Sequence, residues 1–554
     1  MTILLIVCIV LFHQDLPPLL RLRNFLEKLE SPFSQYTSVV LVMLVISMLA
    51  SVIVLVTTSK YGIGLSPDST NYITTATNIA RGRGYNNFLG DPFVYWPPLY
   101  PFVLSIFERA GISSCDGAQI LNAFLLGALS LSIGAMLLYW RIATYRAMIA
   151  VVVTFLLVPH IYVFSYAWSE PLFIFLSWIA YLFTLRYVNK PTIGRILTAS
   201  VLMSTVTLTR YAGIFFVVGV DLFLLAYFLR RIRLKKLIGH LILFNTVVAT
   251  PLAAWLFFNF TRTGTLTGRR DITNLTFMDN FLALINSCKE YFFQSSSAIF
   301  AAFLLLSTVA VLVSLFSSKP TARMNIISLA FLMVLSFLAF LGISASAIKF
   351  DSIGPRLISP IGVFVLVSTV IALDSLIRLS SICLVRTFMQ VFGILIFFSL
   401  LFGVSKTATG LITHSALYGS GGVNSDFYRQ SDILSEVNQY NTKNSIIYAY
   451  NEASVTKLKY LLWQQNNHKI KTRIRLVSTC YHKTSTRTDS AAQFLSDIHS
   501  KGNVTVLIPS ANYPNEKKCD LSLPEMSQWA VIAKQESYPE GDIVLLKLKK
   551  TNGL

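Results

Sequence analysis

The chain has 554 residues, of which 54% are hydrophobic and 13% charged, and its mean hydropathy is +0.61. This composition excludes an ordinary soluble protein and indicates that much of the chain lies in a bilayer. The net charge of +20 would suit a nucleic-acid-binding protein, but the basic residues cluster in alternate loops between apolar runs. We therefore expect a polytopic α-helical membrane protein with membrane lipids around it and no nucleic-acid partner.

Apolar runs that can cross a bilayer follow one another along most of the chain. A spanning helix needs about 20 mostly apolar residues, and hydropathy gives about 11 such runs. They are residues 37–58, 119–140, 147–165, 171–187, 196–209, 211–229, 237–258, 298–316, 325–346, 358–377 and 387–404. Residues 1–36 are expected to form a cytoplasmic or peripheral segment. A cleaved signal peptide is the alternative, although its charged n-region and its cleavage site are missing.

The basic residues predict the orientation of these runs. They gather at 21–28, 141–146, 186–195, 230–236, 319–323 and 378–386, which all fall on one side if every run spans. By the positive-inside rule that side is the cytoplasm. The N-terminus is then cytoplasmic, and the external parts are loop 59–118, the turn at Glu170, loop 259–297, turn 349–357 and the C-terminal tail. We expect a multi-pass protein of the plasma (inner) membrane.

The first external loop, residues 59–118, is long and contains a predicted helix. Ser66 can cap a helix whose first residue is Pro67, and two glycines end it. Apolar side chains that include Tyr72 line one face of this helix. We therefore expect it to lie along the outer membrane surface, with Asp68 held in its first turn.

From about residue 407 the chain becomes polar, and a glycine-rich linker at 419–422 leads into a different pattern. The segments 445–450, 474–477, 504–509 and 543–548 are predicted strands, and 452–463 and 491–500 are predicted helices. Such alternation favours a small α/β layer. The predicted domains are the segment 1–36, a transmembrane catalytic domain 37–406 that includes loop 59–118, and an external soluble α/β domain 407–554.

Several short motifs occur in order along the membrane half of the chain. They are Ser66-Pro67-Asp68-Ser69, Tyr72, Gly82-Arg83-Gly84-Tyr85, Trp96-Pro97-Pro98-Leu99-Tyr100-Pro101, Trp168-Ser169-Glu170-Pro171, Thr209-Arg210-Tyr211 and Gly354-Pro355-Arg356. Together they resemble the GT-C glycosyltransferases, and among these the bacterial protein-mannosyltransferase-like branch. The resemblance implies a hexosyl- or pentosyltransferase that moves a sugar from a polyprenyl-phosphate carrier to a lipid, glycan or protein acceptor.

The resemblance also implies roles for four charged residues. Asp68 takes the catalytic place, where a carboxylate can remove the proton of an acceptor hydroxyl in an inverting reaction. Glu170 is implied to face the same cavity and to orient the acceptor or a cation. Arg210 and Arg356 are candidates for the donor phosphate, since guanidinium groups bind phosphate in bidentate fashion and stabilise its departure.

Each of these residues also has a structural explanation. The helix macrodipole favours an acid in a first turn, which would account for Asp68, and an acid before a proline commonly begins a helix, as at Glu170. Arginines near helix ends commonly extend to lipid headgroups. Two external arginines nevertheless run against the positive-inside bias, and binding of an anionic carrier would explain Arg210 and Arg356.

The aromatic residues of the first loop are secondary candidates for substrate binding. They are Tyr72, Tyr95, Trp96 and Tyr100. The last three can stack on a sugar ring, although an aromatic belt at headgroup depth is the commoner reason for such residues.

Metal dependence is left open by the sequence. Members of the resembling family often carry two neighbouring acids in this loop, whereas Ser69 follows Asp68 here. The histidines and the six cysteines show no metal-ligand spacing. We therefore predict no metal ligands, and a divalent metal remains the alternative.

Two functions other than sugar transfer stay open. One is a transporter or flippase of a solute or a lipid-linked intermediate, and the other is a non-catalytic member of the fold. Ion-coupled transporters place several ionisable residues near the midplane and repeat their helices in two halves. Here Asp221 is nearly alone inside an apolar run, and its partner is not evident from the sequence.

Overall fold

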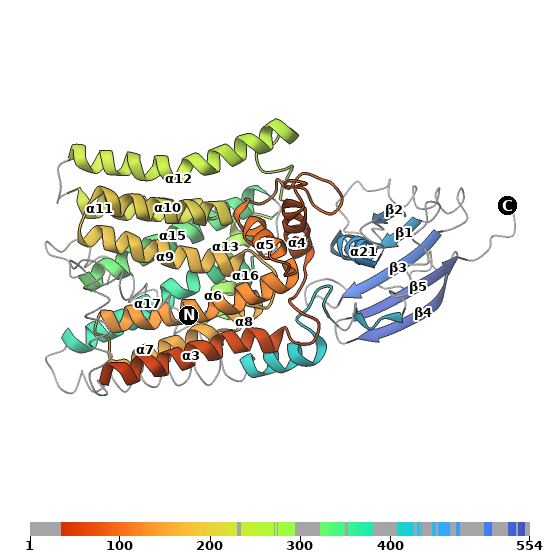
Figure 1. Cartoon of the computed structure of the whole chain (residues 1–554), viewed down its shortest axis with the longest axis horizontal. Helices are drawn as coiled ribbons and strands as arrows, with labels where there is room; N and C mark the ends of the chain where they lie inside the picture. The colour runs from red at the N-terminus through yellow and green to blue at the C-terminus, as the bar shows by residue number, and fades with distance from the viewer. Residues whose placement is uncertain are drawn as a thin grey trace. The chain divides into compact units, whose positions relative to one another are not determined.

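The computed structural model describes residues 35–229, 234–270, 272–273, 275–293, 308, 322–348, 353–379, 407–425, 429–432, 434, 446–449, 452–465, 473–476, 504–511, 530–538 and 541–548. The chain divides into two compact units (Figure 1). The first unit comprises Met1–Thr57 and Pro92–His414, and the second comprises Thr58–Asp91 and Ser415–Leu554. The predicted domains kept the whole first loop with the membrane helices, whereas the units divide that loop at residue 91.

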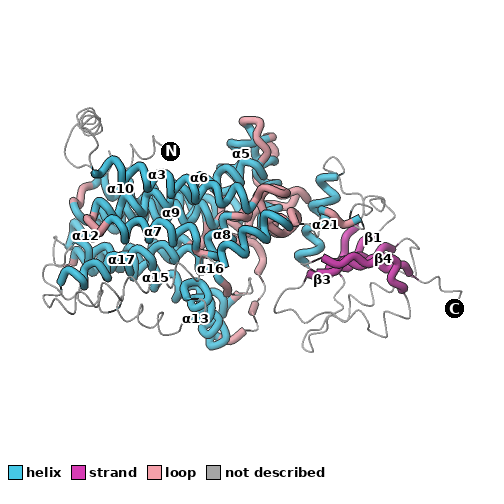
Figure 2. The backbone as a smooth tube through the Cα atoms, turned by 90° about the horizontal axis from the view of Figure 1, so that it is seen from below, coloured by secondary structure: helices cyan, strands magenta, loops and turns pink. Residues whose placement is uncertain are grey.

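The first unit is a bundle of helices, most of which lie side by side along one direction (Figure 1, Figure 2). They are α3 (Gln35–Thr57), α5 (Leu99–Arg109), α6 (Ser114–Tyr139), α7 (Thr144–Leu156), α8 (Val158–Phe164), α9 (Glu170–Asn189), α10 (Ile193–Thr209), α11 (Gly213–Phe228), α12 (Leu234–Thr263), α13 (Phe277–Phe293), α15 (Ala322–Ala347), α16 (Pro355–Ile358), the 3-10 helix η1 (Ser359–Ile361) and α17 (Gly362–Leu379).

By length and composition, six of the described helical stretches can cross a membrane, or seven if the bent pair α7 and α8 forms one span. Helices α10 and α11 are apolar but shorter. The predicted runs coincide with described helices except 298–316 and 387–404, which lie largely outside the described residues. The total of about 11 spans therefore stays a prediction of the hydropathy rule.

Asp374 in α17 joins three helices at one end of the bundle. Its buried carboxylate pairs with Arg146 of α7 and with Arg323 of α15, the latter at 2.8 Å between Nη1 and Oδ2. Arg323 also donates to the backbone oxygen of Trp140 at 2.9 Å. The beginnings of α7 and α15 and the end of α17 thus meet at one end of the bundle, and that this end faces the cytoplasm stays a prediction.

Replacing Asp374 by Asn should destabilise the first unit, because two largely buried guanidinium groups would lose their counter-charge. Loss of one partner of a buried ion pair typically costs about 3–5 kcal/mol. Thermal unfolding of the protein in detergent should therefore shift clearly downward. Asp116→Asn is the matched control, since Asp116 is exposed at the start of α6; equal unfolding temperatures for both variants would contradict the prediction.

The second unit contains the helices α4 (Pro67–Ala80) and α21 (Glu452–Gln465) and a five-stranded sheet. The strands are β1 (Ile446–Ala449), β2 (Arg473–Leu476), β3 (Val504–Ala511), β4 (Ala530–Tyr538) and β5 (Gly541–Leu548), in the order β2-β1-β3-β5-β4. β1 pairs in parallel with β2 and β3, and β5 is antiparallel to β3 and β4.

Strands β1, β2, β3 and β5 and helix α21 fall on segments predicted from the sequence, whereas β4 was not predicted. Its register with β5 shifts between Ile532 and Lys534, and such a bulge interrupts the alternation by which a strand is detected. The predicted helix 491–500 lies outside the described residues. That residues 407–554 form an external domain of their own remains a prediction.

Helix α4 begins after Ser66, as predicted, and the Oγ of Ser66 accepts a hydrogen bond from the backbone N–H of Ser69 at 3.3 Å. Threonines as well as apolar side chains of α4 are buried, and that the helix lies along the outer membrane surface stays a prediction. Thr70, Thr74 and Thr77 return their hydroxyls to backbone carbonyls of the preceding turn. Satisfied in this way, a threonine can be buried like an apolar residue.

A buried lysine makes the stability of the second unit depend on pH. Lys457 of α21 is 6% exposed, and burial lowers its pKa from 10.5 to about 8. Between these two pH values the unfolded chain binds more protons than the folded one, so stability should rise with pH across that window. In thermal-unfolding scans, Lys457→Met should remove this rise of stability with pH. The control Lys459→Met, which changes a half-buried lysine nearby, should keep the rise. A rise that persists in Lys457→Met would contradict this.

Candidate active site

The turn that carries the site follows a broken helix. Helices α7 and α8 meet at an angle of 53°, and Pro159 in the first turn of α8 cannot continue the hydrogen bonding of α7. At the other end of α8, the side-chain amide of Asn122 donates to the backbone oxygens of Phe164 and Tyr166, both at 2.9 Å. These bonds fix the chain just before Trp168 and the start of α9.

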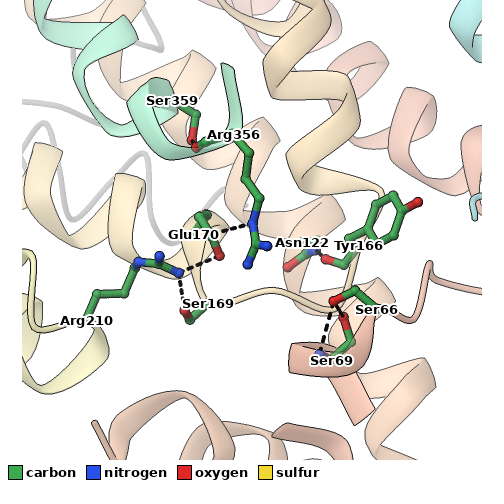
Figure 3. A network of polar contacts seen from close by, with 9 residues as sticks. All are labelled: Ser66, Ser69, Asn122, Tyr166, Ser169, Glu170, Arg210, Arg356 and Ser359. Atoms are coloured by element: carbon green, nitrogen blue, oxygen red, sulfur yellow. Dashed lines mark hydrogen bonds and ion pairs between the residues drawn. The ribbon is translucent and has the colours of Figure 1, made fainter. Parts of the chain in front are cut away.

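Glu170, the first residue of α9, is 1% exposed and binds two arginines (Figure 3). Arg210 Nη1 lies 2.8 Å from Glu170 Oε2, and Arg356 Nε lies 2.7 Å from Glu170 Oε1. Arg210 Nη1 also donates to the hydroxyl of Ser169 at 2.9 Å. We call Glu170, Arg210 and Arg356 the Glu170 cluster.

The two arginines reach this carboxylate from positions where helices end or begin. Arg210 stands in extended conformation immediately after α10, before α11 begins. Arg356 lies in the single turn of α16, which starts at Pro355, and the hydroxyl of Ser359 donates to the backbone oxygen of Arg356 at 2.8 Å. Both guanidinium groups therefore extend from short connections rather than from the middle of spans.

An aromatic stack supports Arg356. Its guanidinium carbon lies 3.8 Å from the centre of the Trp168 ring, which stacks on Tyr166 at 4.3 Å with an interplanar angle of 15°. Tyr162 meets the same indole edge-on at 5.3 Å. Tyr162 and Tyr166 had not been singled out from the sequence, and Trp168 had appeared only as part of a motif. The available signal was the density of aromatic residues between Tyr162 and Trp168.

The charges of the Glu170 cluster sum to one positive unit, since two guanidinium groups face one carboxylate. The side chains of Arg210 and Arg356 are 20% and 17% exposed, so solvent reaches the cations and not the acid. A guanidinium carries five N–H donors, and the contacts to Glu170 and Ser169 use a minority of them. The arrangement is suited to binding an anion of low charge.

The other sequence candidates are distributed over both units. Asp68 and Tyr72 belong to the second unit, where Asp68 is half-buried in the first turn of α4 and Tyr72 is fully buried. Tyr95, Trp96 and Tyr100 belong to the first unit. Tyr95 is 41% exposed, and its backbone oxygen accepts from Arg270 at 3.0 Å. Trp96 stacks on Phe93, and Tyr100 is fully buried in α5. These exposures leave Tyr95 the most accessible of the aromatic candidates.

Asp221, the acid found inside an apolar run of the sequence, has a polar partner. The side-chain amide of Asn245 on α12 donates to Asp221 Oδ1 at 3.0 Å. Among the described residues, no group of three or more His, Cys, Asp or Glu side chains is arranged to hold a metal ion.

No protein-family model matches the sequence, and a search of curated proteins finds no match. Among solved structures, ArnT from Cupriavidus metallidurans in the apo state is similar with a TM-score of 0.53 at 12% identity, over 93% of this chain and 98% of that chain. ArnT from the same organism bound to undecaprenyl phosphate gives a TM-score of 0.53 at 13% identity, over 92% and 98%.

The similarity supports the expectation of a polytopic helical membrane protein. It gives no support to the narrower expectation of the protein-mannosyltransferase-like branch. At this level of identity the likeness is one of fold, and the chain has an ArnT-like membrane fold.

Proposed function

We propose that the protein is an integral membrane glycosyltransferase that moves a sugar from a polyprenyl-phosphate carrier to an acceptor on the non-cytoplasmic face of the plasma (inner) membrane. The observation that carries this proposal is the Glu170 cluster, a buried carboxylate that holds two partly exposed guanidinium groups in a fold shared with ArnT. The sugar is a hexose or pentose, and the acceptor is a lipid, glycan or protein.

The charge of the Glu170 cluster suits such a donor. A phosphodiester that links a carrier lipid to a sugar has one negative charge, which matches the single net positive charge of the cluster. During transfer the bond between the anomeric carbon and the phosphate oxygen breaks, and its electron pair stays on the phosphate. Arg210 and Arg356 stabilise this growing charge through charge-assisted hydrogen bonds. Glu170 uses both oxygens on the arginines, so we assign it to positioning them rather than to orienting the acceptor or a cation.

Asp68 is the proposed general base. The acceptor oxygen forms its bond to the anomeric carbon while its proton passes to the Asp68 carboxylate. Attack from the side opposite the phosphate inverts the configuration of the sugar. In this proposal the carboxylate of Asp68, half-buried in the first turn of α4, takes the part of the base. No step of it needs a metal, although a divalent ion stays compatible with the acids present.

The experiment that tests this function compares cells with and without the gene. Loss of one sugar from a lipid-linked glycan or surface polymer, with accumulation of its polyprenyl-phosphate donor, is the expected result. Purified protein in liposomes should then transfer that sugar to the acceptor. If the purified protein moves a lipid intermediate across the bilayer and transfers no sugar, the transporter or flippase alternative replaces the proposal.

A further inference from the structure

The chain immediately before Asp68 is paired with a distant segment of the same unit. The backbone N–H of Leu65 donates to Gly421 O at 3.2 Å, and the N–H of Val423 donates to Leu65 O at 2.9 Å. Together they form a parallel bridge between Leu65 and Gly422. Ser66, the N-cap of the helix that carries Asp68, follows at the next position. The start of that helix is therefore tied to residues far along the chain.

Side chains extend this pairing toward the beginning of the loop. The amide of Asn424, 3% exposed, donates to the backbone oxygen of Ile63 at 2.7 Å, and the hydroxyl of Ser420 donates to that of Gly62 at 2.6 Å. Arg429 in turn donates from Nε to Asn424 Oδ1 at 3.1 Å. Both the nitrogen and the oxygen of the Asn424 amide are thus hydrogen-bonded. The backbone oxygen of Ile63 before α4 therefore accepts from a side chain whose orientation is fixed. We call residues 419–424 the clamp.

The sequence pattern at residues 419–422 indicated a glycine-rich linker. In the structure, the glycines of the clamp instead permit a close approach between backbone segments. Gly422 has φ +64, and a Cβ there would lie 1.9 Å from the backbone oxygen of Leu65. Gly419 has φ +91, and a Cβ there would lie 2.3 Å from the backbone oxygen of Asn424. A larger residue at Gly422 would force the two segments apart, and a larger residue at Gly419 would distort the clamp itself.

The C-terminal part of this unit also contacts the loop beyond α4. Helix α21 packs against α4, and the ring of Tyr460 meets that of Phe88 edge-on with centroids 6.1 Å apart. The clamp therefore contacts the chain before the Asp68 helix, and α21 contacts that helix and the loop after it.

We propose that the clamp positions Asp68 for catalysis, with Asn424 and Gly422 as its positioning residues. This inference rests on the proposed function, because it takes Asp68 as the base. Catalytic geometry tolerates little error, and a displacement of about 1 Å can cost about 100-fold in rate. The clamp acts on the backbone three to six residues before Asp68, where a shift moves the first turn of α4 directly.

The test is Asn424→Ala in the full-length protein reconstituted in liposomes. We expect kcat for sugar transfer to fall about 10- to 100-fold with the KM for the donor unchanged, since Arg210 and Arg356 do not belong to the clamp. Hydrogen exchange of the α4 amides should become faster. The control is Asn86→Ala, which also removes a bond from a side-chain amide to a backbone oxygen, here on the loop after α4, and should retain kcat.

A glycine pair gives a second test that does not depend on Asn424. Gly422→Ala should lower kcat and speed α4 exchange in the same way, whereas Gly410→Ala should not, because a Cβ at Gly410 meets nothing within 4 Å. Unchanged α4 exchange, or a loss confined to the donor KM, would overturn the clamp. That failure is distinct from failure of the proposed function, in which the unaltered protein would transfer no sugar, and from failure of the base assignment, in which Asp68→Asn would keep full activity.

Discussion

Asp68→Asn is expected to lower the rate of sugar transfer by about 100- to 10,000-fold, the range that a positioned general base contributes. Asparagine keeps the size of the side chain and its place in the first turn of α4, but it cannot accept the proton of the acceptor hydroxyl. The KM for the donor should stay near its normal value, because donor binding is assigned to the Glu170 cluster. Steady-state transfer from a labelled polyprenyl-phosphate sugar in liposomes, at varied donor concentration, measures both quantities.

The matched control for Asp68 is Asp116→Asn. Asp116 also stands in the first turn of a helix behind a serine cap, with Ser113 donating to its carboxylate at 2.7 Å. If acids in first turns served only the helix macrodipole, both variants would lose a similar small amount of stability and neither would lose turnover. Near-normal turnover of Asp68→Asn would remove Asp68 from the mechanism. A protein that no longer runs as a single species on size exclusion would indicate a structural role.

The composition of the sequence sufficed to predict the helical membrane fold, because a spanning segment is local and its apolar length is legible from residues alone. Contacts between residues far apart in the sequence could not be predicted in this way. Glu170, Arg210 and Arg356 were each named from separate motifs, but the ion pair between Glu170 and Arg356 joins residues 186 positions apart. Nothing in the spacing indicates that one carboxylate serves both arginines. For the same reason Asp374, which organises the other end of the bundle, was not singled out.

One local pattern was misread because its meaning depends on what it contacts. The glycines at 419–422 indicated a linker, but the same permissive backbone allows Gly422 to approach Leu65. Only the partner segment distinguishes a flexible glycine from a packed one.

Arg356→Lys is expected to raise the KM for the donor and to lower kcat, with a combined loss of about 10- to 100-fold in kcat/KM, as for one charge-assisted hydrogen bond. Lysine keeps the charge but has neither the Nε that contacts Glu170 at 2.7 Å nor the planar group that lies 3.8 Å from Trp168. The phosphate would then meet an ammonium group that is not held in place. Steady-state kinetics at varied donor concentration separates the two parameters.

Arg262→Lys is the control for this change. Arg262 also lies over an aromatic ring, that of Phe258 at 5.2 Å, but it is exposed at the end of α12 and has no assigned role in binding. Loss of its stacking should alter kcat/KM less than about twofold, since an exposed cation–π contact contributes only about 0.5 kcal/mol or slightly more to stability. If Arg356→Lys behaved like Arg262→Lys, the Glu170 cluster would be a structural ion pair, and the donor phosphate would require a different site. Glu170 would still need both arginines as counter-charges in order to be buried. That outcome would therefore mean that the Glu170 cluster stabilises the fold and does not bind the donor.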